Sequence, residues 1–179
     1  MINRIMAGVV GLTMLLSVPI VPKNVDEKEV VVANDHEILL CVKRIAPISE
    51  QDKIDMAKCV YAECRGETSE CQRGVCAVLY NRYKSGNYAS MHDVIFASNQ
   101  FATDNFDNIS EEDIHDQLNI VEKTIKYGPS LPEYVIYFRA SHYHTMSDAA
   151  DLTQIDKTFF SLSRKLYQKY TGEVYSDSD

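Results

Sequence analysis

The sequence predicts a single α+β domain that is predominantly helical, with a small strand element. Helix-capping patterns recur along the chain, and apolar residues follow them at helical spacing. One short β-branched and aromatic run, residues 134–138, has the character of a strand. A length of 179 residues suits one domain with a substantial core.

The first predicted helix begins at Ser49, where Asp52 lies three residues further on as in a capping box. Glu63 lies on its last turn, beside an apolar stripe, and Gly66 is expected to end it. Residues at helical spacing are predicted to face the core: Ile54, Ala57 and Tyr61.

A second helix is predicted from Ser69, whose capping box includes Gln72, to about residue 83. Further helices are expected over residues 90–96, from Ser110 to a stop signal at Gly128, and over residues 156–170 before Gly172.

The ends of the chain differ from this domain. In residues 1–22, Arg4 precedes an uncharged apolar run, which predicts a signal peptide or a membrane anchor and therefore export. Residues 23–48 are expected to be a linker or an N-terminal extension, and residues 49–172 the compact domain. Residues 173–179 form an acidic tail that is predicted to be disordered.

The composition and net charge limit the classes of molecule that the protein is expected to bind. Hydrophobic residues make up 45% of the chain and charged residues 25%, as in ordinary soluble domains. The formal net charge of −8 and the lack of a basic stripe argue against nucleic acid. An anionic polymer would gain no electrostatic attraction, so its binding would require a shaped groove.

Residues 61–67 (YAECRGE) carry the strongest chemical signal, because they place Glu63 and Glu67 around Gly66 at a helix end. A partly desolvated carboxyl group has a raised pKa and can act as a general acid. Such carboxylic acids cleave glycosidic bonds. For an isolated pair of glutamates, a solvated helix end is the commoner explanation.

The neighbouring motifs favour a catalytic glutamate over a solvated helix end. Residues 61–67, 71–72 and 75–82, followed by matches at 94–96, 100–101 and 136–138, resemble the core of the SleB-like cell wall hydrolases, the spore cortex-lytic enzymes and their relatives. The resemblance covers residues 57–139. It implies a lysozyme-like fold and lytic cleavage of peptidoglycan between N-acetylmuramic acid and N-acetylglucosamine, with one glutamate as acid and base.

By position, the resemblance makes Glu63 the catalytic residue. Hydrolysis instead of lytic cleavage would need a second carboxylate, for which Glu67 is the first candidate and Asp104 and Asp107 are weaker ones. Side chains suited to binding sugar are Gln100, Phe101 and Tyr137, and the structural residues of the motif are Gln72, Asn81 and Arg82. Peptidoglycan is the expected partner, and no cofactor or metal is expected.

The chain departs from the family at residues 157–160, where a Gly-x-His-x-Phe element is frequent but the histidine is missing. No peptidoglycan-binding repeat domain is expected within residues 1–179, so binding would rely on the catalytic groove or on a partner. Insertions over residues 104–113 are expected to reshape one wall of the groove.

The cysteines admit three interpretations. Small buried side chains at a close helix contact are favoured, ahead of nested disulfides Cys64–Cys71 and Cys59–Cys76, and ahead of a metal site. Cys41 remains unpaired in any scheme. His142 and His144 are assigned to a loop at the edge of the groove rather than to a metal.

Two other functions stay open: a catalytically silent peptidoglycan-binding or assembly protein, and a cysteine- or metal-dependent wall hydrolase. The sequence does not choose between vegetative wall, spore cortex and the wall of a phage host as target.

Overall fold

The computed structural model describes residues 31–33, 36–38, 45–98, 100–140, 143 and 146–176. The signal peptide or anchor predicted for residues 1–22, and the predictions for Cys41, His142 and His144, lie outside these residues. None of the helices in the described ranges has the length and apolar character needed to cross a membrane. The predicted domain boundaries stay predictions.

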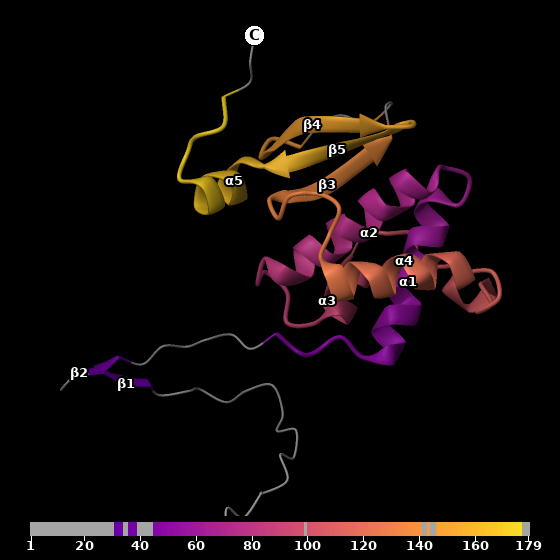
Figure 1. The fold of residues 1–179 in the computed structure, drawn as a ribbon, viewed down its shortest axis with the longest axis horizontal. Coiled ribbons are helices and arrows are strands. Elements are labelled where there is room, and N and C mark those ends of the chain that lie inside the picture. The colour runs from indigo at the N-terminus through magenta and orange to yellow at the C-terminus, as the bar shows by residue number, and fades with distance from the viewer. Residues whose placement is uncertain are drawn as a thin grey trace, which may run out of the picture.

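The described residues form five α-helices, one 3-10 helix and two small sheets (Figure 1). The helices are α1 (Glu50–Cys64), α2 (Ser69–Lys84), α3 (Met91–Ile95), α4 (His115–Tyr127) and α5 (Arg164–Thr171), with the 3-10 helix η1 at Phe106–Asn108. β1 (Val31–Ala33) and β2 (His36–Ile38) pair antiparallel. The second sheet has the antiparallel order β3-β5-β4, with β3 at Val135–Ala140, β4 at Ala149–Ile155 and β5 at Thr158–Ser163.

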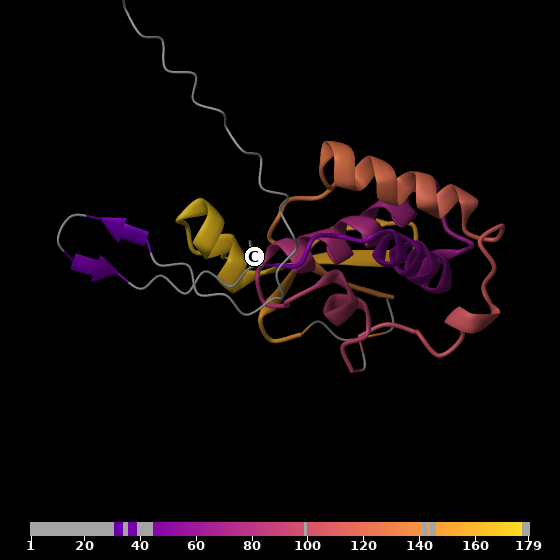
Figure 2. The ribbon, with the colours of Figure 1, turned by 90° about the horizontal axis from the view of Figure 1, so that it is seen from below.

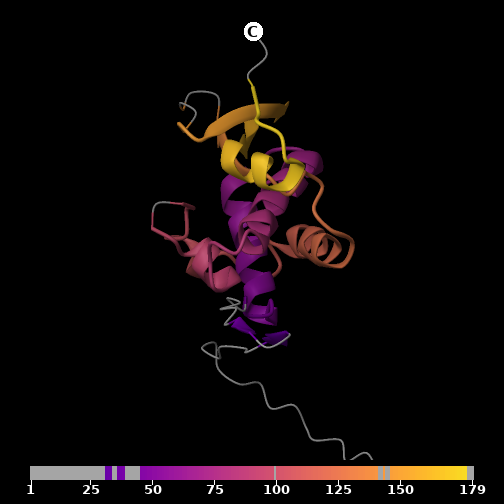
Figure 3. The ribbon, with the colours of Figure 1, turned by 90° about the vertical axis from the view of Figure 1, so that its left-hand side faces the viewer.

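The helices and the second sheet form two layers. α1, α2 and α4 pack on one another, and α2 also contacts β3 and β4. Seen from below, α4 runs along one side of the α1–α2 pair, while η1 lies on the other (Figure 2). Figure 3 shows the two layers from the side, with the three-stranded sheet above the α1–α2 pair. The predicted helical domain with a small strand element is confirmed.

The core is tightest where α2 meets β5. A Cβ atom at Gly74 would lie 2.5 Å from Cζ of Phe160, so only glycine allows this approach. Phe160 is fully buried, and so are the largest aliphatic side chains around it and between the helices: Met56, Leu79, Met91, Ile95, Ile114 and Leu162.

Local capping explains where the first and third helices begin. The Ser49 hydroxyl accepts a hydrogen bond from the backbone N–H of Asp52 (3.1 Å), and the Ser49 N–H donates to the Asp52 carboxylate (2.8 Å), so the predicted capping box is confirmed. Ser90 caps α3 in the same way through the N–H of Asp93 (3.1 Å). Gly128, with φ 94°, ends α4 as predicted.

The start of α2 corrects the sequence prediction. Thr68, not Ser69, is the N-cap, and its hydroxyl accepts a hydrogen bond from the N–H of Cys71 at 3.3 Å. Gln72 therefore takes no part in a capping box. α4 likewise begins at His115, several residues after the Ser110–Asp113 capping contacts.

The helix predicted over residues 156–170 is wrong in its first half. Residues 149–163 form the hairpin β4–β5, and Asp156 occupies its turn with φ 53°, a conformation that aspartate tolerates better than most residues. Only α5 is helical, capped by Ser163 and ended by Gly172 at φ 77°. The β-branched and aromatic run at residues 158–160 was the missed strand signal.

Candidate active site

Glu63 lies on the last turn of α1 with its side chain half-buried. Its Oε1 atom accepts a hydrogen bond from the backbone N–H of Ala102 at 2.9 Å. Ala102 belongs to the loop that follows α3, so a tertiary contact fixes this carboxylate in position.

The buried side chain of Arg82 lies close to Glu63 and binds groups from two other segments. It lies at the C-terminal end of α2, and only 7% of its surface is exposed. Its Nε donates to the carbonyl oxygen of Ile136 at 2.7 Å, and its Nη1 donates to Oε1 of Gln100 at 2.9 Å. Burial lowers the pKa of the Arg82 guanidinium, and nearby groups, including Glu63, act in the opposite direction.

Two aromatic rings complete this group. The guanidinium carbon of Arg82 lies 4.9 Å from the ring centroid of Phe101 and 5.9 Å from that of Tyr137. Both rings are half-buried, whereas Gln100 is exposed. The structure thus brings Gln100 and Phe101 from the loop after α3 and Tyr137 from β3 together around the buried cation of Arg82. We call these four residues the Arg82 cluster.

The remaining motif residues support the framework. The Nδ2 of Asn81 donates to the carbonyl oxygens of Pro132 (2.8 Å) and Val135 (3.0 Å), which fixes the entry into β3. The Nε2 of Gln72 donates to the carbonyl oxygen of Glu67 at 3.2 Å, and Gln72 accepts from Nε2 of Gln117 at 3.0 Å. These bonds join the α1–α2 turn to α4.

The other carboxylates predicted from the sequence lie on the turn after α1 and on the loop after α3, whereas an unpredicted carboxylate, Asp148, is hydrogen-bonded to Tyr137 of the Arg82 cluster. Glu67 is half-buried in the turn between α1 and α2. Asp104 and Asp107 are exposed on the loop after α3. This loop is anchored to α1 through Lys58, whose Nζ donates to the carbonyl oxygen of Phe106 at 2.8 Å.

A cavity of about 320 Å³ opens between the end of α1 and the same loop, and Glu63 is not among the residues that line it. Ala102, whose N–H holds Glu63, lines it. Its other walls combine an aromatic ring, amides and both signs of charge: Tyr61, Ala62, Arg65, Asn105, Asn108, Ile109 and Asp113. Hydrogen bonds from Ser110 lower the pKa of the Asp113 carboxyl.

Sequence reasoning did not find this cavity. The insertion over residues 104–113 was the available signal, since it places several amides and carboxylates close together. The N–H of Ala102 leaves no signal, because every residue except proline carries one.

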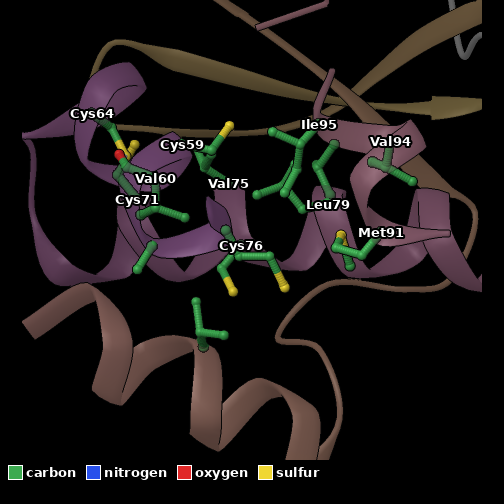
Figure 4. Close-up of a cluster of buried hydrophobic side chains, with 14 of the residues drawn as sticks. Cys59, Val60, Cys64, Cys71, Val75, Cys76, Leu79, Met91, Val94 and Ile95 are labelled. Atoms are coloured by element: carbon green, nitrogen blue, oxygen red, sulfur yellow. The ribbon is translucent and has the colours of Figure 1, made fainter. Parts of the chain in front are cut away.

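The four cysteines of the α1–α2 pair are reduced and buried (Figure 4). The favoured prediction, small buried side chains at a helix contact, is confirmed by their exposures of 0% for Cys59, Cys71 and Cys76 and 4% for Cys64. Within the described ranges, no group of three or more histidine, cysteine or acidic side chains is placed to hold a metal ion.

Comparison with solved structures identifies the fold as SleB-like. The catalytic domain of the germination-specific lytic transglycosylase SleB from Bacillus anthracis aligns over 73% of this chain and 99% of its own length, with a TM-score of 0.55 and 23% identity. The catalytic domain of the Bacillus cereus SleB protein aligns over 65% of this chain and 94% of its own length, with a TM-score of 0.53 and 23% identity. No protein-family model and no curated protein matches the chain.

Proposed function

We propose that this protein cleaves the glycan strand of peptidoglycan as a lytic transglycosylase, with Glu63 as its acid and base. The observation that carries the proposal is the position of Glu63 in a SleB-like fold. The carboxyl group is half-buried, close enough to Arg82 for their charges to interact, and bound by the N–H of Ala102, a residue that also lines the cavity.

In the lytic route, one carboxyl group serves both steps. Glu63 first protonates the glycosidic oxygen between N-acetylmuramic acid and N-acetylglucosamine, and the bond to the muramyl C1 breaks. The Glu63 carboxylate then removes the proton of the muramyl 6-hydroxyl, whose oxygen closes an anhydro ring on C1. The bond from Ala102 to Oε1 leaves Oε2 as the oxygen that exchanges the proton.

The Arg82 cluster supplies a surface for sugars. Because Arg82 donates to Oε1 of Gln100, the amide nitrogen of this exposed side chain is left to donate to the carbonyl of an N-acetyl group. Phe101 and Tyr137 add aromatic area beside it. Nothing in this arrangement needs a positive surface, which agrees with the net charge of −8.

The decisive experiment is mass spectrometry of the soluble fragments that the protein releases from purified peptidoglycan. We expect anhydromuramyl products from the parent protein and a loss of about 100-fold or more in their rate of release with Glu63→Gln. Glu67→Gln is the matched control, because it makes the same isosteric change in the neighbouring turn and should retain activity.

Other outcomes would redirect the assignment. Reducing-end muramic acid would indicate hydrolysis and a second carboxylate, with Glu67 as the first residue to test. Loss of activity with an alkylating agent or a chelator would favour a cysteine- or metal-dependent hydrolase. Binding to peptidoglycan without any released fragment would make the protein a silent wall-binding protein. An enzyme of this kind must reach the wall, which agrees with the export expected from residues 1–22.

A further inference from the structure

The α1–α2 turn holds two thiols in contact. Cys64 is the last residue of α1 and Cys71 lies in the first turn of α2, with the exposed residues 65 and 66 and the capping residue Thr68 between them. The thiol of Cys64 donates to the carbonyl oxygen of Val60 at 3.0 Å, and the two thiols are within hydrogen-bonding reach of each other. Figure 4 shows the two side chains converging at one end of the helix pair.

The other two thiols do not converge in this way. Sγ of Cys76 lies 3.4 Å from the hydroxyl oxygen of Thr124 on α4, whereas Cys59 is close enough to Glu63 and Arg82 to interact with their charges. In Figure 4 the sulfur atoms of Cys59 and Cys76 point to opposite sides of the helix pair. A step of five residues turns a helix by about 140°, so one contact between two helices aligns only one such pair.

The pair is also chemically asymmetric. The hydrogen bond from Cys64 lowers the pKa of the Cys71 thiol to about 7, and the Thr158 hydroxyl acts in the same direction, against burial and the charges of Asp156 and Glu67. The same hydrogen bond, together with burial, raises the pKa of Cys64. In the closed turn Cys71 is therefore the more readily ionised of the two thiols, and the thiolate is the form that attacks a disulfide.

We propose that Cys64 and Cys71 form an intramolecular disulfide when the chain folds in the presence of a disulfide oxidant, and that Cys59 and Cys76 remain thiols. The thiolate of one of the two cysteines attacks one sulfur of the oxidant, forming a mixed disulfide and releasing one thiolate. The other cysteine then loses its proton and attacks the sulfur of the first, which releases the second thiolate. One disulfide is reduced to two thiols, and the two cysteines are oxidised.

Burial of both sulfur atoms places this exchange in the folding chain, before the turn closes over them. The resulting bond would tie the last turn of α1, which carries Glu63, to the start of α2. Formation of this disulfide does not depend on the enzymatic activity proposed above.

The test is to refold the reduced full-length protein with and without oxidised glutathione, block free thiols after unfolding, and map the linkage by peptide mass spectrometry. We expect a Cys64–Cys71 linked peptide as the main oxidised product and alkylated Cys59 and Cys76. A short closed loop of this size should raise the melting temperature by about 5 to 10 °C, and dithiothreitol should reverse the rise.

Matched variants separate this pair from the other buried thiols. Cys59→Ala with Cys76→Ala should keep the glutathione-dependent rise, and Cys64→Ala or Cys71→Ala should lose it. A main linkage of Cys59 to Cys76 or of any cysteine to Cys41, or no linkage at all, would overturn the proposal. The linkage map of the parent protein answers this question even if a variant fails to fold.

Discussion

The two halves of α2 are held in the fold by different forces. The N-terminal half packs small, apolar groups closely, with Gly74 against Phe160 and Cys76 against α4. The C-terminal end buries polar side chains instead, and Asn81 and Arg82 bind backbone carbonyls of the β3 region. One helix therefore joins a hydrocarbon-like core to a polar cluster at the candidate active site.

This difference predicts different responses to mutation. A side chain of the wrong size in the packed half lowers the free energy of unfolding only in part, because neighbouring side chains can shift to accommodate it. A lost partner at the polar end leaves a buried acceptor without a donor, which is costly and also releases other side chains of the candidate site. Mutations at the polar end should thus change stability and activity together, and those in the packed half should change stability alone.

The largest effect is expected for Arg82→Met, which keeps much of the side-chain volume but removes the guanidinium. It leaves the buried Ile136 carbonyl without its donor, at a cost of about 2 kcal/mol in the free energy of unfolding, and it releases the exposed Gln100 side chain to water. Urea denaturation measures this cost. The rate of fragment release should also fall, because Gln100 and Phe101 lose their common support.

Arg82→Lys is the control for charge. Lysine keeps the cation but cannot reach both acceptors with a planar fork, so it should recover only part of the stability and activity. Full recovery by lysine would mean that the positive charge alone, not the hydrogen-bond geometry, supports the cluster.

A smaller effect is expected for Gly74→Ala in the packed half. Its new methyl group would meet the Phe160 ring at 2.5 Å, and overpacking of this kind costs about 1 to 3 kcal/mol. The better helix propensity of alanine returns up to about 1 kcal/mol, so a net loss of about 1 kcal/mol is expected. Urea denaturation should detect it, while the activity per folded molecule stays unchanged.

A double-mutant cycle identifies the cause. In a Phe160→Leu background the alanine methyl group has room, and Gly74→Ala should become neutral or stabilising. An equal loss in both backgrounds would show that contact with Phe160 is not the reason.

The smallest effect concerns Asp156, an exposed residue that joins the β4–β5 turn to the start of α2. Hydrogen bonds from the hydroxyl (2.6 Å) and the N–H (3.0 Å) of Thr68 lower the pKa of its carboxyl group. The group therefore adds stability above the unfolded-state pKa of about 4, and this contribution disappears as the pH falls through the lower folded-state pKa.

Asp156→Asn tests this, because asparagine also tolerates the positive φ of 53°. At pH 7 we expect the melting temperature of the variant to be lower than that of the parent protein by about 2 °C at most. Near pH 2 the two melting temperatures should be equal. A difference that persists unchanged at pH 2 would assign the effect to the turn conformation rather than to the carboxylate.

How far the sequence predicted the fold depended on the range of the interactions involved. The helices that begin after Ser49 and Ser90 were correct, because a cap and an apolar stripe are local features. The hairpin β4–β5 was missed, because pairing with β3 and burial of Phe160 against Gly74 favour strand over helix there. Propensity within the segment could not report these distant partners.

The candidate site divides in the same way. Its residue types and order along the chain were visible in the motifs, and so was the placement of Glu63 at the end of a helix. The grouping of Gln100, Phe101 and Tyr137 around Arg82 could not be predicted. A guanidinium has five donors, and nothing in the sequence indicates the direction in which they point.

The sequence by itself determined a mainly helical domain, the helix ends that depend on local caps, and the position of Glu63 beside the apolar core. Only the tertiary structure decided which backbone N–H holds that carboxylate, which thiols meet, and that a cavity opens beside α1. The physical reason is the range of the interactions: caps and periodicity act within a few residues, whereas these contacts join segments that meet only when the whole core forms.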